Sequence, residues 1–130
     1  MRLTILAILA VISLTAQAQK KILIESKDEI IEMAAKELTL AMQPPEGSLY
    51  LFKKEFNIKG EYIFDITIRE KGEVASVFVA GNEGGTIQQQ NLVKDKVKNF
   101  EFSFKMPKGK TYKFQYILNF DKAESTRSEP

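Results

Sequence analysis

The sequence contains no cysteine and no histidine among its 130 residues. Without cysteine, the chain has neither a disulfide framework nor a thiolate metal site. Without histidine, it lacks both the commonest general base of enzymes and the commonest protein ligand of metal ions. We therefore expect a domain that folds by packing alone, with no catalytic, cofactor-binding or metal site.

A strong charge of either sign is also missing. Nineteen Lys and Arg residues nearly balance seventeen Asp and Glu residues, so the net charge is +2. The lysines are spread along the chain rather than gathered in one short run, which argues against a nucleic-acid partner and against a strong overall attraction to anionic lipid. With 44% hydrophobic and 28% charged residues, the composition is ordinary for one globular domain.

The first 18 residues have the pattern of a secretory signal peptide. Arg2 precedes an apolar run from Leu3 to Leu14, and Ala16-Gln17-Ala18 forms an A-x-A cleavage site before Gln19. The alternative is an uncleaved anchor, but the run is shorter than the ~20 residues that a spanning helix needs. No cysteine follows it, which excludes a lipoprotein anchor. We expect export, most simply to the periplasm with secretion as the alternative, and no stable membrane span after cleavage.

The segment from Gly60 to Gly81 predicts a β-hairpin. Glu70-Lys71-Gly72 breaks the alternation, and Gly72 can adopt the positive φ that a hairpin loop often needs. Apolar residues fall at every second position of the first strand, which predicts one buried face: Tyr62, Phe64, Ile66 and Ile68. The return strand carries Val74, Val77, Phe78 and Val79.

Two capping patterns predict helices. Ser26-Lys27-Asp28-Glu29 is a capping box that opens a helix, and Pro44-Pro45 ends it. Thr86-Ile87-Gln88-Gln89 repeats the pattern with glutamine as the partner. The short lead Ile22-Leu23-Ile24 adds an edge strand or docks on the core.

The segment from Ser48 to Ile58 suits either a strand or a helix. Tyr50, Phe52, Phe56 and Ile58 share one strand face, whereas Leu49, Phe52 and Phe56 have helical spacing. The density of aromatic residues and a hairpin-like connection at Asn57-Ile58-Lys59-Gly60 favour the strand.

Two more alternating segments complete the chain: Phe100 to Met106, and Thr111 to Phe120 after a turn at Pro107-Lys108-Gly109. The predicted order is therefore α-β-β-β-α-β-β. It predicts an α+β two-layer sandwich, in which an antiparallel sheet of about five strands has one aromatic face covered by two helices. Residues 19–121 form this single domain, and residues 122–130 form a polar tail.

From about Phe56 to Phe120 the chain resembles the TonB C-terminal domain family. The residues that carry the resemblance are Gly60-Glu61-Tyr62, Phe64-Asp65-Ile66-Thr67-Ile68, Lys71-Gly72-Glu73-Val74, Val77-Phe78-Val79, Leu92-Val93-Lys94-Asp95-Lys96-Val97-Lys98, Phe100-Glu101-Phe102, Pro107 and Tyr116-Ile117-Leu118-Asn119-Phe120. Members of that family are periplasmic modules with two helices packed on a small antiparallel sheet, and they bind short peptide segments of outer-membrane receptors by strand addition. This chain has no Pro-rich spacer and its N-terminal segment looks cleaved, so the resemblance implies fold and compartment rather than energy transduction.

The resemblance implies a non-enzymatic module whose partner is a protein or peptide of the cell envelope. The segment from Lys110 to Phe120 is then the candidate edge strand, because an unpaired strand edge can recruit an extended peptide. The candidate partner-binding side chains are Tyr112, Lys113, Gln115 and Tyr116. The alternative for the two tyrosines is a place in the core, since regular alternation usually marks buried positions.

Two other classes of function remain. An enzyme without His or Cys needs a Ser–Lys arrangement or a carboxylate pair, and the available residues have no diagnostic spacing: Asp65, Glu73, Ser48, Ser76 and Ser103. A periplasmic inhibitor or immunity-type protein also uses an exposed edge or loop and needs no chemistry.

The predicted cleavage site gives a direct test. N-terminal sequencing of exported protein should begin at Gln19, because the small residues at Ala16 and Ala18 fit the signal peptidase. Material that begins at Met1 would overturn the signal-peptide prediction.

Overall fold

A computed structural model describes residues 20–121, so the predicted signal peptide and polar tail lie outside the described residues. The elements, in chain order, are β1 (Ile22–Leu23), α2 (Lys27–Ala41), α3 (Ser48–Phe56), β2 (Glu61–Arg69), β3 (Val74–Glu83), α4 (Ile87–Lys98), β4 (Phe104–Lys105) and β5 (Thr111–Asn119). Within this part of the chain, no helix is long and apolar enough to cross a membrane.

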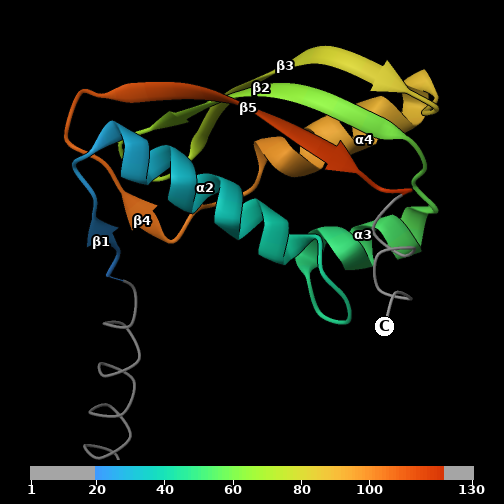
Figure 1. The fold of residues 1–130 in the computed structure, drawn as a ribbon, viewed down its shortest axis with the longest axis horizontal. Helices are drawn as coiled ribbons and strands as arrows, with labels where there is room; N and C mark the ends of the chain where they lie inside the picture. The colour runs from blue at the N-terminus through green and yellow to red at the C-terminus, as the bar shows by residue number, and fades with distance from the viewer. Residues whose placement is uncertain (1–19, 122–130) are drawn as a thin grey trace, which may run out of the picture.

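The described chain forms two layers. Strands β3, β2 and β5 make an antiparallel sheet with β2 in the centre, and all three helices lie against one face of it (Figure 1). The α+β class with an antiparallel sheet is thus confirmed. The other face of the sheet carries no helix from residues 20–121.

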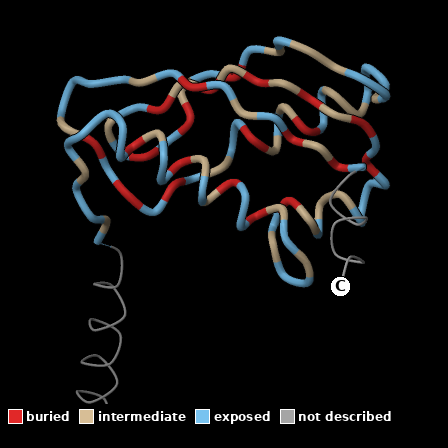
Figure 2. The backbone as a smooth tube through the Cα atoms, viewed as in Figure 1, coloured by how far each residue is buried: buried red, intermediate tan, exposed pale blue. Residues whose placement is uncertain are grey.

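Strand β2 shows why this face of the sheet is covered. Its side chains alternate without interruption between buried and partly exposed, and the buried set consists of the four residues that the sequence predicted: Tyr62, Phe64, Ile66 and Ile68. Burying each such side chain away from water stabilises the fold by about 1.5–3 kcal/mol. The buried residues therefore lie between the sheet and the helices (Figure 2).

Helix α2 begins where its capping box predicted. The Ser26 hydroxyl accepts a hydrogen bond from the Glu29 amide (3.5 Å), and Asp28 and Glu29 occupy the first turn, where negative charge favours the helix dipole. One side of the helix is buried against the sheet: Ile30, Ala34, Leu38 and Ala41.

The prediction of a strand at Ser48–Ile58 is wrong, because Ser48–Phe56 forms helix α3. Helical spacing prevails here: Leu49 is buried and Phe52 packs against the core from one turn further on. Phe52 and Phe56, one turn apart, are in contact with their rings tilted by 48° and their ring centroids 4.9 Å from each other. Asn57 ends the helix in the left-handed conformation, with φ of 54°.

The segment from Phe100 to Met106 was predicted as a strand of the main sheet, and this pairing is wrong. Two residues, Phe104 and Lys105, pair instead in parallel with β1, which confirms the lead at Ile22 as an edge strand. The predicted alternation does hold, since Phe102, Phe104 and Met106 are all buried. The segment bonds to the β2–β3 turn: the amides of Phe102 and Met106 donate to carbonyls in it, at Gly72 (2.9 Å) and Glu70 (2.7 Å). The main sheet therefore has three strands rather than about five.

Gly85 lies directly against the core and gives a test of its packing. A Cβ placed on Gly85 would overlap the hydroxyl of Tyr62, whose side chain is fully buried and donates to the Lys59 carbonyl (2.7 Å). Gly85→Ala should therefore lower the free energy of unfolding by about 1–3 kcal/mol in urea denaturation. Adding Tyr62→Leu removes the hydroxyl together with the ring carbons that the Cβ would also overlap, so the two losses should be less than additive. Fully additive losses would contradict this packing.

Candidate functional site

Strand β5 lies at an edge of the sheet, as the candidate site requires. It pairs with β2 over all nine of its residues and without a register shift, from Arg69↔Thr111 to Glu61↔Asn119. No other strand pairs with its outer side within residues 20–121. The outer side faces the viewer in Figure 1, with α2 beneath it rather than beside it.

The hydrogen bonds next to β5 identify which of its backbone groups point outward. The Phe120 amide donates to the Gly60 carbonyl (3.0 Å), so the hydrogen-bonded pairs with β2 fall on even-numbered β5 residues. On the other side of β2, the Arg69 amide donates to the Glu73 carbonyl (2.9 Å), so the odd-numbered residues of β2 direct their backbone groups toward β3. This leaves the even-numbered residues of β2 to bond with β5, in agreement with the Phe120 bond. The N–H and C=O groups of Lys113, Gln115 and Ile117 therefore point away from the sheet.

The side chains of the same residues lie on the face of the sheet that no helix covers. Lys113 and Gln115 are exposed, as predicted for the outward pair, and Ile117 is about half exposed. The Gln115 side-chain amide donates to the Asp65 carboxylate (3.0 Å), which connects β5 to β2 on this face. If a strand were added to β5, its side chains on this face of the sheet would lie beside a lysine, an amide and an aliphatic group.

The two tyrosines point to the opposite side, toward α2. Both are partly buried and pack against the core, so the core alternative holds in part. The hydroxyls of Tyr116 and Thr39 are 2.8 Å apart and share a hydrogen bond, and the Lys27 ammonium lies 6.0 Å from the centre of the Tyr112 ring. Between these two contacts, Ile31 follows Lys27 by one helical turn and packs partly against the core.

We call the surface formed by Tyr112, Tyr116 and the adjacent side of α2, at Lys27, Ile31 and Thr39, the tyrosine shelf. The contribution of α2 was not foreseen from the sequence. The helical period of α2 identifies which side of the helix is buried, but it does not identify the strand that the neighbouring, partly exposed side of the helix contacts. No pattern within a single element contains that information.

Burial changes the acidity of two tyrosines. Desolvation raises the pKa of Tyr116 above its ordinary value of 10.0, and the hydrogen bond with Thr39 opposes part of that rise. Desolvation also raises the pKa of Tyr62, and the nearby negative charge of Asp121 adds to the effect. Both phenols therefore act as neutral hydrogen-bonding groups at physiological pH.

The opposite edge of the sheet is a poorer template for an added strand. The pairing of β3 with β2 shifts register twice, between Ile63 and Phe64 and between Thr67 and Ile68. Each shift leaves an extra residue in β3, which bends the strand and interrupts the even spacing of its outward groups. A regular extended peptide therefore matches β5 better than β3.

The residues considered for catalysis do not converge. Asp65 and Glu73 are separated by about 13 Å along the hairpin, since Glu73 pairs beside Arg69, four residues from Asp65. This exceeds the ~5–9.5 Å between the two carboxylates of glycosidases. Ser103 hydrogen-bonds Glu37, while Ser48 opens α3 and Ser76 lies on β3. No group of three or more carboxylates is arranged to hold a metal ion in the described part of the chain.

The raised pKa values predict weaker folding at alkaline pH. A tyrosine with a folded pKa above 10.0 stabilises the fold fully below pH 10, and this contribution is lost as the pH rises through the folded pKa. The free energy of unfolding, measured with urea between about pH 9 and pH 11, should therefore fall with rising pH. Tyr62→Phe lacks one ionising group and should show a shallower fall. An equal slope in both proteins would contradict the assignment.

Comparison of the chain with protein-family models, with curated proteins and with solved structures finds no match in any of the three. The resemblance to the TonB C-terminal domain family thus stays a prediction. The function of the β5 edge has to be inferred from the geometry of its own residues.

Proposed function

We propose that the protein is an exported, non-enzymatic module that binds an extended peptide segment of a cell-envelope protein by adding it to the edge of β5. The observation that carries the proposal is the outward direction of the backbone groups of Lys113, Gln115 and Ile117 on a strand without a register shift. Such groups form main-chain hydrogen bonds with any extended peptide.

Backbone bonds alone do not make this edge a tight binder. Three residues offer six groups, and each hydrogen bond contributes about 0.5–1.5 kcal/mol net. Ordering the peptide backbone costs about 1–2 kcal/mol for each residue fixed, which offsets most of that gain. The affinity must therefore come from the side chains of the partner, and so does the specificity.

The surroundings of β5 indicate which side chains fit. Alternate residues of an added strand point to opposite faces of the sheet. Partner side chains that point toward α2 would lie on the tyrosine shelf, so aromatic or aliphatic side chains of the partner would pack on Tyr112 and Tyr116. Those that point the other way lie beside Lys113 and Gln115, which favour acidic or amide groups. We therefore propose a partner segment with alternating apolar and polar or acidic residues.

The resemblance to the TonB C-terminal domain family supports the same mode of binding, because members of that family bind receptor peptides by strand addition. The order of hairpin, helix and final strand, with the final strand at an edge, also suits this mode.

Single proline substitutions distinguish the backbone from the side chains. Lys113→Pro and Gln115→Pro each remove an outward N–H but no bond to β2, so the folded protein should persist while the partner dissociation constant rises about tenfold or more. Capture of envelope proteins on the immobilised protein, followed by titration of the captured partner, measures the change. Thr111→Pro at the start of β5 should have a smaller effect.

Alanine at the same positions is the matched control. Lys113→Ala and Gln115→Ala keep the N–H and should bind the partner within a few-fold of the wild type. On binding, hydrogen exchange should slow at the amides of Lys113, Gln115 and Ile117, whereas the amide of Phe114 is already protected by β2. Equal partner binding by every folded proline variant would exclude strand addition at this edge.

A further inference from the structure

A second surface lies where β1, the β2–β3 turn and the segment around β4 come together, and it shares no residue with the proposed peptide-binding site at β5. This surface contains a shallow hollow with a volume of about 310 Å³. We call it the basic hollow, and the residues that line it are Lys20, Lys21, Lys71, Glu73, Glu101 and Lys105.

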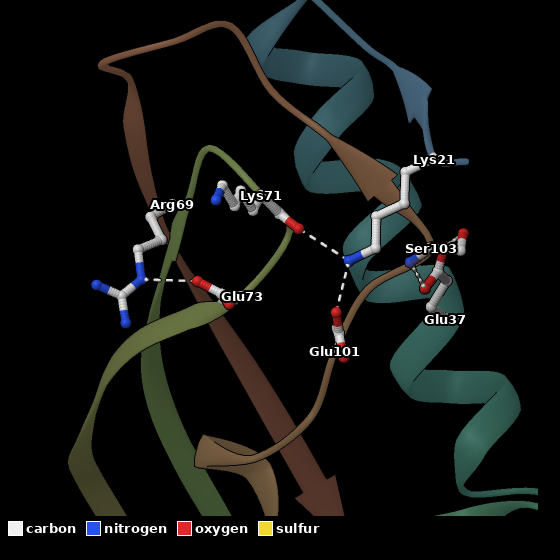
Figure 3. A network of polar contacts seen from close by, with 7 residues as sticks. All are labelled: Lys21, Glu37, Arg69, Lys71, Glu73, Glu101 and Ser103. Carbon is white, nitrogen blue, oxygen red and sulfur yellow. Dashed lines mark hydrogen bonds and ion pairs between the residues drawn. The ribbon is translucent and has the colours of Figure 1, made fainter. Parts of the chain in front are cut away.

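Both carboxylates of the basic hollow are already engaged by cations. Glu101 Oε2 lies 3.1 Å from the ammonium of Lys21, and Glu73 Oε1 lies 3.3 Å from Arg69 Nε (Figure 3). The Lys21 ammonium also donates to the Lys71 carbonyl (2.8 Å), which ties β1 to the turn. In Figure 3 the carbonyl of Lys71 points toward the Lys21 ammonium, whereas its side chain points away from Lys21 and Glu101.

Three further lysines line the basic hollow together with these two ion pairs. Lys20, Lys71 and Lys105 are exposed, and none of them forms an ion pair with another residue between 20 and 121. The local excess of positive charge is therefore larger than the net charge of +2 for the whole chain suggests. The spacing of the lysines along the sequence concealed this, because they come from three separate segments.

An exposed apolar pair lies next to the lysines. Ile22 is 74% exposed and Leu23 is 47% exposed, although both belong to β1 and Ile22 directly follows Lys21. Packing within the domain does not account for these side chains. Aliphatic groups flanked by lysines are typical of a surface that lies in the interface of a bilayer, where the ammonium groups contact lipid phosphates.

We propose that the basic hollow binds the headgroup region of an anionic bilayer, with Lys20, Lys71 and Lys105 on lipid phosphates and with Ile22 and Leu23 entering the interface. A soluble phosphate would contact the lysines but would leave the apolar pair exposed to water. The apolar pair therefore favours a bilayer over a soluble phosphate as the ligand. The apolar run of the leader ends at Leu14, only about 20 Å of extended chain before Lys20. Lys20, which lines the basic hollow, is the first described residue after this apolar run.

Vesicle binding by the exported protein tests the proposal. The protein should sediment with vesicles made of equal parts of phosphatidylglycerol and phosphatidylcholine, and hardly with pure phosphatidylcholine. Each lysine near an anionic surface contributes about fivefold to binding, so a triple variant with Lys20→Gln, Lys71→Gln and Lys105→Gln should bind about 100-fold more weakly. Added salt should weaken binding of the wild type, since exposed charges are screened.

Two further variants separate this site from net charge and from a simple anion site. A variant with Lys59→Gln, Lys94→Gln and Lys98→Gln has the same net charge as the first triple variant but an intact basic hollow, and it should bind within a few-fold of the wild type. Ile22→Ser with Leu23→Ser leaves the charge unchanged and should also weaken vesicle binding. Circular dichroism verifies that each variant is folded. Equal loss in both lysine variants, full retention in the serine variant, or no preference for anionic vesicles would overturn the proposal.

Discussion

The whole described structure depends on the pairing of β2 on both of its sides. Its odd residues bond to β3 and its even residues to β5, while its aromatic and aliphatic side chains fill the core beneath. One strand thus fixes the register of both neighbours. Because its buried side chains alternate without a break, a shift by a single residue would move every one of them to the uncovered face. The position of β5 at the edge follows from this constraint.

The same constraint leaves backbone groups available for binding. The three helices cover the aromatic face, and within the described part of the chain the three-stranded sheet then has two unpaired edges and one open face. The two edges differ because β3 contains two register shifts, whereas β5 has none. Bulges are one way in which proteins make an edge a poor template for further strands. Here β3 has that feature and β5 lacks it, and this asymmetry favours binding at β5.

Much of this arrangement was predictable because it is local. Alternation identified β2 and β5, the apolar return segment after the turn identified β3, and the caps at Ser26 and Thr86 identified the starts of α2 and α4. Ser48–Phe56 was mistaken for a strand because Phe52 and Phe56 satisfy both periods, and its packing beside α2 decided the outcome. The tyrosine shelf and the basic hollow could not be predicted, since each combines side chains from segments that are distant in the sequence. Their assembly depends on tertiary contacts that no periodicity describes.

The two proposed surfaces are connected through the β2–β3 turn. Arg69, at the end of β2, pairs with Thr111 at the start of β5 and also holds Glu73 at the rim of the basic hollow. The β5 edge therefore begins at the end of the domain that carries the lysines and runs away from it. A protein held on a bilayer through Lys20, Lys71 and Lys105 would present β5 pointing outward from the lipid. Since the two surfaces share no side chain, a bound bilayer would leave the outward groups of Lys113, Gln115 and Ile117 free to pair with a peptide.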